Sequence, residues 1–341
     1  MKCALWHWEY FGSFAAMNKH WSIEMKQTLI SDFEELLRVA GSLTKRCVAV
    51  VAADHSATLE AVAAAKTALK SDFLLTGSRK TIEEGLAAHG LAADGIEIVD
   101  AKQPDRLIAP ALEALRGGSA QILLKGKIDT TTLMKAVLAR DSGLRIGRLL
   151  SDIVLFQYAR TSANKFLMIT DGGLNVLPDL PAKKEIIENA VQVAHALGNS
   201  NPKVAVLSAT EFVLPDIPST VDAALLAKMN RRGQIKGCIV DGPFALDNAL
   251  SADAADTKNI SSPVAGQADI LVAPNIESAN MLAKSTTFFA GLRLAHVVMG
   301  AKIPILIPSR SDKSDAKLLS IALGMVMSEY LTHNPPDTDH D

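Results

Sequence analysis

Short apolar segments alternate with helical segments along most of this chain, and this alternation restricts its fold more than any other feature. In the first half, each apolar run is separated from the next by a segment of helical pattern. Because parallel strands need long crossover connections, the pattern predicts a largely parallel sheet with right-handed crossovers. The runs that we expect to be strands here are residues 47–53, 73–75, 96–99 and 121–124.

The second half of the chain interrupts this alternation once. Residues 153–156 and 166–169 are apolar runs joined by a loop, a spacing that suits an antiparallel pair better than a parallel one. Further continuous apolar runs end abruptly in polar residues, as buried strands of an α/β sheet do. These later runs are residues 204–207, 237–240, 270–273, 296–299 and 303–307.

The length of 341 residues exceeds the size at which a single core usually stops growing. We therefore expect an α/β fold of two α/β lobes, with a cleft between them where a small molecule binds. Residues 25–148 and 308–341 are expected to form the first domain, and residues 149–307 the second. Residues 1–24, which hold all three tryptophans, are interpreted as an N-terminal extension.

The composition excludes several classes of protein. A net charge of −2 argues against a nucleic-acid surface as the main function, and no apolar run approaches the roughly 20 residues of a membrane-spanning helix. The spacing of the three cysteines is not that of a metal site. Their small number favours a reduced, cytoplasmic compartment. The balance of 48% hydrophobic and 21% charged residues is that of a soluble globular protein.

Candidate site residues follow the last apolar run. Ser309 offers a hydroxyl and Arg310 a forked cation, and Asp315 lies shortly beyond them. A guanidinium binds phosphoryl oxygens in a bidentate way, and a nearby carboxylate can act as a base. Together these residue types indicate an enzyme that handles a phosphoryl group.

A second candidate anion site follows residues 121–124. Lys125 and Gly126 form a turn that leads into a helix expected near Thr130, whose free N–H groups and dipole would face an anion. The alternative is an ordinary strand-to-helix connection with exposed lysines. Farther along, Asn280 and Lys284 share one helix face and either line the cleft or belong to an exposed polar stripe.

Several long segments, in the right order, resemble the phosphate acetyl/butyryltransferase family. The resemblance extends over roughly residues 48–327. The segments that carry it are LLKGKIDTTTLMKAVL, DGGLNVLPDLPAKKEIIENAV, GPFALDNALS, SPVAGQADILVAPNIESANMLAKSTTFFAG and GAKIPILIPSRSDKSDAKLLSIALG.

This resemblance implies a fold of two α/β/α lobes, related in architecture to isocitrate dehydrogenases, with the active site in the cleft between the lobes. It implies the reversible reaction of acyl-CoA with phosphate to give acyl phosphate and CoA, by direct attack in a ternary complex. Acyl-CoA and phosphate are then substrates, no cofactor or metal is bound, and a homodimer or larger homo-oligomer is expected.

The resemblance also implies roles for individual residues. Asp315 corresponds to the general base that removes the proton of the CoA thiol. Asp312 stays open as the alternative, because Asp315 lies one residue closer to Arg310 than the acetyl-type spacing would place it. Ser309 would stabilise the negative charge that develops on the acyl oxygen, and Arg310 would bind the phosphate.

The remaining residues of the matching segments are candidates for substrate binding. Lys135 follows the butyryl-type pattern, where acetyl-type members tend to have an arginine, and it indicates a preference for butyryl or branched acyl groups. The full set of substrate-binding candidates is Lys125, Gly126, Thr130, Lys135, Asn175, Asn275, Asn280 and Lys284.

Three other functions are weighed against this one. A phosphate acetyltransferase differs only in the acyl group. A decarboxylating dehydrogenase of the same fold would need clustered aspartates for Mg²⁺ or Mn²⁺ and a pocket for NAD, and no such cluster stands out. A non-catalytic sensor of acyl-CoA would have lost the Ser309, Arg310 and Asp315 constellation, which this chain retains.

Overall fold

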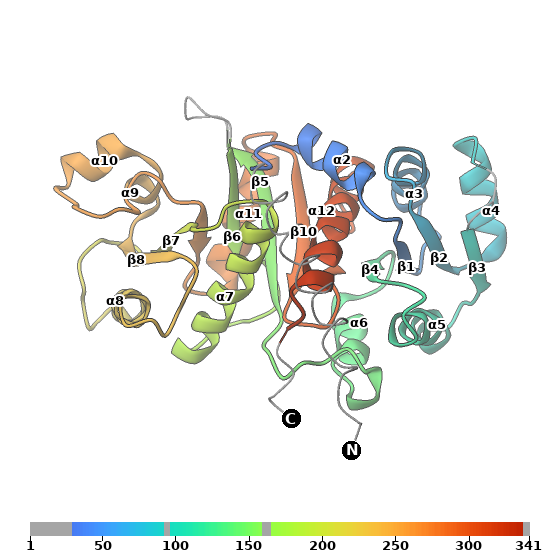
Figure 1. Ribbon diagram of the computed structural model, residues 1–341, viewed down its shortest axis with the longest axis horizontal. Helices are drawn as coiled ribbons and strands as arrows, with labels where there is room; N and C mark the ends of the chain where they lie inside the picture. The colour runs from blue at the N-terminus through green and yellow to red at the C-terminus, as the bar shows by residue number, and fades with distance from the viewer. Residues whose placement is uncertain (1–28, 92–95, 159–164, 337–341) are drawn as a thin grey trace, which may run out of the picture.

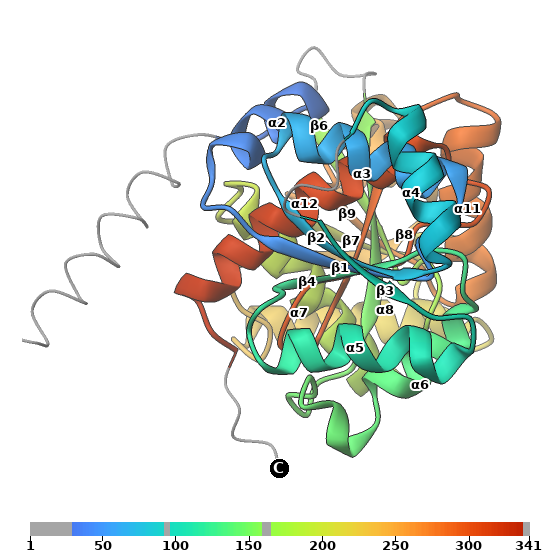
Figure 2. The ribbon, with the colours of Figure 1, turned by 90° about the vertical axis from the view of Figure 1, so that its right-hand side faces the viewer.

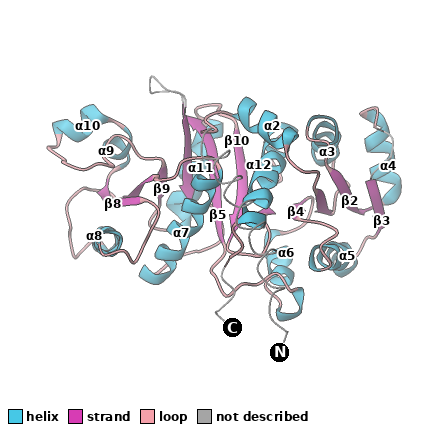
Figure 3. Cartoon of the chain, in the orientation of Figure 1, coloured by secondary structure: helices cyan, strands magenta, loops and turns pink. Residues whose placement is uncertain are grey.

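All the apolar runs that were predicted to be strands form strands, and they join in one mixed sheet of eleven strands. The structure is a computed structural model that describes residues 29–91, 96–158 and 165–336. Helices cover both faces of the sheet, which gives the predicted α/β fold of two lobes (Figures 1 and 3). Residues 1–24, interpreted as an N-terminal extension, lie outside the described residues.

The sheet contains two parallel sets of strands that run in opposite directions. The order across the sheet is β3-β2-β1-β4-β11-β10-β5-β6-β9-β7-β8. The first set is β1 (Cys47–Val51), β2 (Asp72–Gly77), β3 (Ile96–Asp100), β4 (Ile122–Lys125) and β11 (Ile305–Leu306). The second set is β6 (Lys165–Thr170), β7 (Lys203–Leu207), β8 (Ile239–Phe244) and β9 (Ile270–Val272).

Two antiparallel strands join these sets in the middle of the sheet. Strand β5 (Ser151–Tyr158) pairs antiparallel with β6, which confirms the predicted antiparallel pair, and also with β10 (Leu294–Met299). Strand β10 in turn is antiparallel to β11. The boundary between domains that we placed near residue 148 precedes β5 and stays a prediction.

The helices pack in layers against the two sets of strands. In Figure 2, α5 and α6 lie on one side of β1 to β4, and α3, α4 and α12 lie on the other. The helices of the first half are α2 (Phe33–Ser42), α3 (Ser56–Ala68), α4 (Arg79–Ala88), α5 (Pro104–Arg116), α6 (Thr130–Val137) and the short η2 (Arg140–Ser142). Those of the second half are α7 (Leu180–Ala196), α8 (Pro218–Arg231), α9 (Leu246–Leu250), α10 (Ala252–Thr257), α11 (Ile276–Phe288) and α12 (Ser314–His333).

Helix α12 lies over the centre of the sheet, where its mainly apolar sequence is buried on nearly all sides (Figure 1). It packs against α2, α3 and β10, as expected for a last helix that returns to the first half of the chain. The Ser320 hydroxyl of this helix accepts a hydrogen bond of 2.9 Å from the backbone N–H of His296 and so ties α12 to β10. No helix in the described ranges is long and apolar enough to cross a membrane.

The turn after β4 brings two backbone segments unusually close together. A Cβ atom on Gly126 would lie 2.1 Å from the carbonyl oxygen of Ala52 and 2.7 Å from that of Val51. The N–H groups of Gly126 and Lys127 donate to these same two oxygens, each at 2.8 Å. Only glycine allows this approach, so Gly126 sets the position of the loop that enters α6.

We predict that Gly126→Ala destabilises the protein by about 3 kcal/mol, because the added methyl group would push apart β1 and the turn after β4. Thermal or urea unfolding of both proteins measures the difference. Gly118→Ala is the control for backbone strain alone, since that glycine has a positive φ, unlike Gly126, and its Cβ position has no atom within 4 Å. The control should lose about 1 kcal/mol, and equal losses in both variants would contradict the close-approach explanation.

Candidate active site

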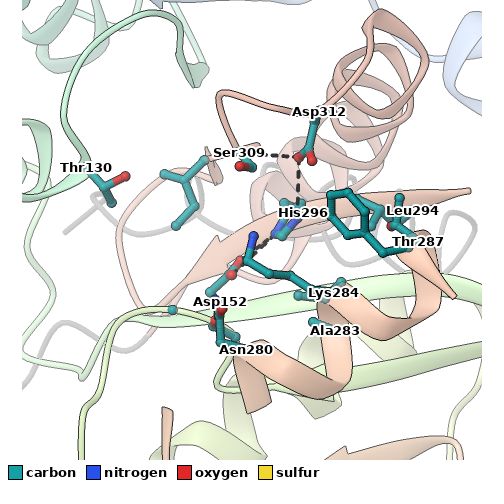
Figure 4. A pocket seen from close by; sticks show the side chains of 15 residues that line it. Thr130, Asp152, Asn280, Ala283, Lys284, Thr287, Leu294, His296, Ser309 and Asp312 are labelled. Carbon is teal, nitrogen blue, oxygen red and sulfur yellow. Dashed lines mark hydrogen bonds and ion pairs between the residues drawn. The ribbon is translucent and has the colours of Figure 1, made fainter. Parts of the chain in front are cut away.

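A pocket lies between α11 and the face of the sheet where β5 and β10 meet (Figure 4). Side chains alternate along a strand, so Asp152 and Val154 of β5 point to the same face. The pairing of Val154 with His296 places His296 and Leu294 of β10 on that face as well. The lining residues are Thr130, Asp152, Val154, Gly172, Gly173, Asn280, Ala283, Lys284, Thr287, Phe288, Leu294, His296, Ile307, Ser309 and Asp312.

Helix α11 forms the opposite wall through one face. Asn280, Ala283, Lys284 and Thr287 are spaced by three and four residues, the spacing that brings side chains to one side of a helix. The helix begins at its cap, Asn275, whose side-chain oxygen accepts from the backbone N–H of Ser278 at 3.0 Å. The Asn280 side chain donates to the carbonyl oxygen of Gly172 at 3.2 Å, which fastens this wall to the loop after β6.

The loop after β11 closes the pocket from above. The Asp312 carboxylate turns back and accepts a hydrogen bond of 2.7 Å from the backbone N–H of Ser309. This bond holds the turn so that the Ser309 and Asp312 side chains both line the pocket (Figure 4). Arg310, between them in sequence, is exposed.

His296 lies between two carboxylates in the pocket. Its Nδ1 atom is 3.3 Å from both oxygens of Asp152, and its Nε2 atom is 3.8 Å from Oδ2 of Asp312. Burial lowers the pKa of His296, but the charge and hydrogen bond of Asp152, together with Asp312, outweigh it and raise the pKa above its ordinary value. The imidazole therefore titrates in a buried site with negative charge on both sides.

A turn of two glycines holds Asp152 in place. A Cβ atom on Gly172 would lie 2.7 Å from Oδ2 of Asp152, so this position has no room for a side chain. Asp171 stabilises the same turn, because its carboxylate accepts from the backbone N–H groups of Asp152 and Gly173, each at 3.0 Å. Burial raises the pKa of Asp171.

Two buried lysines, Lys125 and Lys317, lie near the loop that carries Ser309 and Asp312. Lys125, at the end of β4, is only 3% exposed, and burial, followed by the charges of Arg310 and Lys317, lowers its pKa. Burial likewise lowers the pKa of Lys317, whose amine donates to the backbone oxygen of Asp312. Burying these cations costs free energy of desolvation, and their charges repel each other. An anionic ligand would offset this repulsion, so the arrangement favours binding of an anion.

The predicted site residues divide into three groups. Thr130, Asn280, Lys284 and Ser309 line the pocket. Lys125 and Arg310 are not in the lining, but their charges interact with each other and, in the case of Lys125, with that of the lining residue Asp312. The others lie outside the lining: Gly126, Lys135, Asn175, Asn275 and Asp315.

Those outside the pocket have visible structural contacts or are exposed. Asn275 caps α11, and the side-chain amide of Asn175 donates to Leu150 O at 2.8 Å and to the carboxylate of Asp171. Lys135 is exposed on α6. The start of α6 is capped by Asp129, whose carboxylate accepts from the N–H of Thr132 at 3.0 Å, so a carboxylate already faces this end of the helix.

Asp315 is held away from the pocket by Arg293. The guanidinium binds both oxygens of the Asp315 carboxylate, at 2.9 and 2.8 Å, and also reaches Glu34 at 2.8 Å. This ion pair lies on the first turn of α12 and is partly exposed to solvent. The structure therefore brings Asp312, and not Asp315, to Ser309.

Several pocket residues were not singled out by the sequence reasoning. Asp152 and His296 were missed, and so were the apolar residues Val154, Ala283 and Leu294. A signal was available, because a histidine within an apolar run and an aspartate next to one are unusual on buried strands. Within the residues that the structure describes, no group of three or more His, Cys, Asp or Glu side chains is arranged to hold a metal ion.

Comparison with known proteins gives a consistent result. The family described as phosphate acetyl/butaryl transferase matches residues 105–325. A probable phosphate butyryltransferase of Bacillus subtilis is 43% identical over 88% of this chain and 99% of its own length, and a phosphate acetyltransferase of Thermotoga maritima is 40% identical over 86% and 99%. The crystal structure of a branched-chain phosphotransacylase from Enterococcus faecalis superposes with a TM-score of 0.73 at 31% identity, covering 83% of this chain and 99% of that one.

We predict that Lys125→Met stabilises the protein at neutral pH by about 1–2 kcal/mol, because it removes a buried cation. The pKa of Lys125 is lower in the folded than in the unfolded chain. Its charge therefore destabilises the folded state below the folded pKa, and this penalty disappears as the pH rises toward the ordinary lysine value of about 10.4. Unfolding at pH 7 and near pH 10 should show the advantage of the variant shrinking with pH.

The exposed neighbour Lys127 provides the matched control for this measurement. Lys127→Met should change the stability by less than about 0.5 kcal/mol at either pH. A Lys125→Met variant that is less stable than the wild type at neutral pH would show that the buried amine is compensated in the folded state.

Proposed function

The chain belongs to the phosphate acetyl/butyryltransferase family and is an acyltransferase, and we propose that it prefers butyryl or branched acyl groups. The reaction is acyl-CoA + phosphate ⇌ acyl phosphate + CoA. One observation carries the preference: the pocket is lined both by polar side chains, Ser309 among them, and by the apolar side chains of Val154, Ala283 and Leu294. A single cavity thus offers a place for a charged phosphoryl group and for a hydrocarbon chain.

The polar residues in and near the pocket support a role in binding phosphate. Arg310 can present two parallel N–H donors to phosphate oxygens, and the buried Lys125 adds a second positive charge. The Ser309 hydroxyl faces the pocket and can donate to the acyl oxygen as negative charge develops there. Lys284, on the opposite wall, provides a further positive charge beside the bound substrate.

The apolar residues of the lining support the acyl preference. Val154 and Leu294 lie on neighbouring strands, and Ala283 faces them from α11. All three are buried, and Ala283 is small enough to leave room for a chain longer than acetyl. Placing hydrocarbon against these side chains stabilises binding by about 0.8 kcal/mol for each buried methylene.

Asp312 is the carboxylate that we place at the reacting centre. It lines the pocket beside Ser309 and faces His296, whereas both oxygens of Asp315 are bound by Arg293. CoA is a substrate here and no resident cofactor is proposed. The homodimer or larger homo-oligomer and the cytoplasmic location stay predictions.

We predict phosphate-dependent release of CoA from butyryl- or isobutyryl-CoA without added metal or NAD. Arg310→Ala should lower kcat/KM by about 10²–10³, because a charged donor at the transferring group is lost. Asp312→Asn should also lower it strongly, while Asp315→Asn should retain activity within about threefold, as expected for a partly exposed ion pair. Trapping of the free thiol gives the rate.

Arg106→Ala, on the exposed side of α5, controls for the general effect of removing an arginine. Loss of activity in Asp315→Asn with a fully active Asp312→Asn would place Asp315, and not Asp312, at the reacting centre and contradict the assignment. Release of thiol from acetyl-CoA alone would make the protein a phosphate acetyltransferase.

We predict that Ala283→Leu shifts the preference toward acetyl-CoA, because the larger side chain fills the space for the third and fourth carbons. The ratio of kcat/KM for butyryl-CoA to that for acetyl-CoA should fall at least about tenfold. Met281→Leu, which is 66% exposed on the same helix, should leave this ratio unchanged. An unchanged ratio in Ala283→Leu would show that the acyl chain lies elsewhere.

A further inference from the structure

We propose that His296 is a catalytic residue that carries the proton between the sulfur of CoA and the oxygen of phosphate, and that Asp152 is its positioning residue. The inference rests on the proposed acyl transfer. The site residues discussed so far hold the phosphate, the acyl oxygen and the acyl chain, but the transfer of the thiol proton needs a group of its own. Figure 4 shows that His296 points into the pocket between Asp152 and the Ser309–Asp312 turn.

The geometry favours one tautomer of the neutral ring. Nδ1 faces the buried carboxylate of Asp152 at 3.3 Å, so the proton belongs on Nδ1 and is donated to Asp152. The lone pair of Nε2 then faces the pocket. The nearest carboxylate oxygen on that side, Oδ2 of Asp312, is 3.8 Å away, which is too far for a hydrogen bond. Nε2 is therefore placed to accept a proton from a bound ligand.

The chemistry of the thiol favours an imidazole over a carboxylate as its base. An ordinary thiol has a pKa of about 8.5, an imidazole about 6.5 and an aspartate about 3.9, and proton transfer is most efficient between groups of similar pKa. Oδ2 of Asp312 is also occupied, since it accepts the N–H of Ser309 at 2.7 Å. Asp312 instead stabilises the imidazolium once His296 has taken the proton.

The charged groups around His296 come from three elements. Asp152 faces it from β5, Asp312 from the loop after β11 and Lys284 from α11. The lysine lowers the pKa of His296, as burial does, while the two carboxylates raise it, and the net direction is upward. Ser320 of α12 contacts only the backbone N–H of His296 and carries no charge.

The proposed step conserves atoms and charge in both directions. As CoA attacks the acyl phosphate, the S–H bond breaks and an N–H bond forms on Nε2, while the new S–C bond forms. The C–O bond to phosphate then breaks, and Nε2 returns the proton to the leaving oxygen, so that phosphate leaves as HPO₄²⁻ and not as PO₄³⁻. In the reverse direction the same nitrogen takes the proton of HPO₄²⁻ and returns it to the sulfur.

This route requires a neutral His296 at the start of both directions. We therefore expect kcat/KM to fall at acid pH as His296 becomes protonated. The apparent pKa of this fall should lie above the ordinary histidine value. It should be the same for the reaction of acyl-CoA with phosphate and for that of acyl phosphate with CoA. His296→Gln should lose about 10²–10⁴ in kcat and should lose this limb of the profile. Asp152→Asn should move the limb to lower pH, because it removes a charge that favours the imidazolium.

His89→Gln is the matched control, since His89 is exposed at the end of α4 and should leave the profile unchanged. KM for acyl-CoA and the unfolding temperature should change little in Asp152→Asn, which separates a shift in proton transfer from a loss of structure. If His296→Gln keeps its activity within about threefold, or if the acid limb stays in place in Asp152→Asn, the inference is wrong. A wild-type protein that transfers no acyl group at all would instead overturn the proposed function.

Discussion

The antiparallel pairing of β5 with β10 is the contact on which the rest of the structure depends. It joins two parallel sets of strands that run in opposite directions. It also fixes the register in which Asp152 and Val154 stand beside His296 and Leu294 on one face. Because side chains alternate along a strand, a slip of one residue would turn all of these groups to the opposite face. The fold and the pocket are thus set by the same hydrogen bonds.

The pocket and its surroundings retain buried charged groups that a core selected only for stability would replace. Asp152 has a side chain only 4% exposed, and Lys125 is almost fully buried beside two other cations. Each costs free energy of desolvation that apolar residues would avoid. Such groups are expected where a protein binds an ion or moves a proton. His296 compensates part of the cost of Asp152, because its imidazole lies between two carboxylates and hydrogen-bonds to that of Asp152.

Much of the fold could be predicted from sequence because it depends on local patterns. Each apolar run became a strand, and the short loop before 166–169 revealed the antiparallel pair. The site was harder to predict from the sequence, because Asp152 and His296 are 144 residues apart and meet only through the pairing of β5 with β10. Asn175 and Asn275 fulfil local roles in a turn and a cap, and Arg293 engages Asp315; none of these contacts is visible in a motif.

The central claim is that acyl transfer takes place between α11 and the face formed by β5 and β10. The most direct test is a crystal structure with phosphate and an unreactive butyryl-CoA analogue in which a methylene replaces the sulfur. We expect the acyl carbons between Val154, Ala283 and Leu294, the phosphate at Arg310, and the methylene within about 4 Å of Nε2 of His296. An acyl chain bound outside this pocket, or a methylene nearer to Asp315 than to His296, would contradict the account.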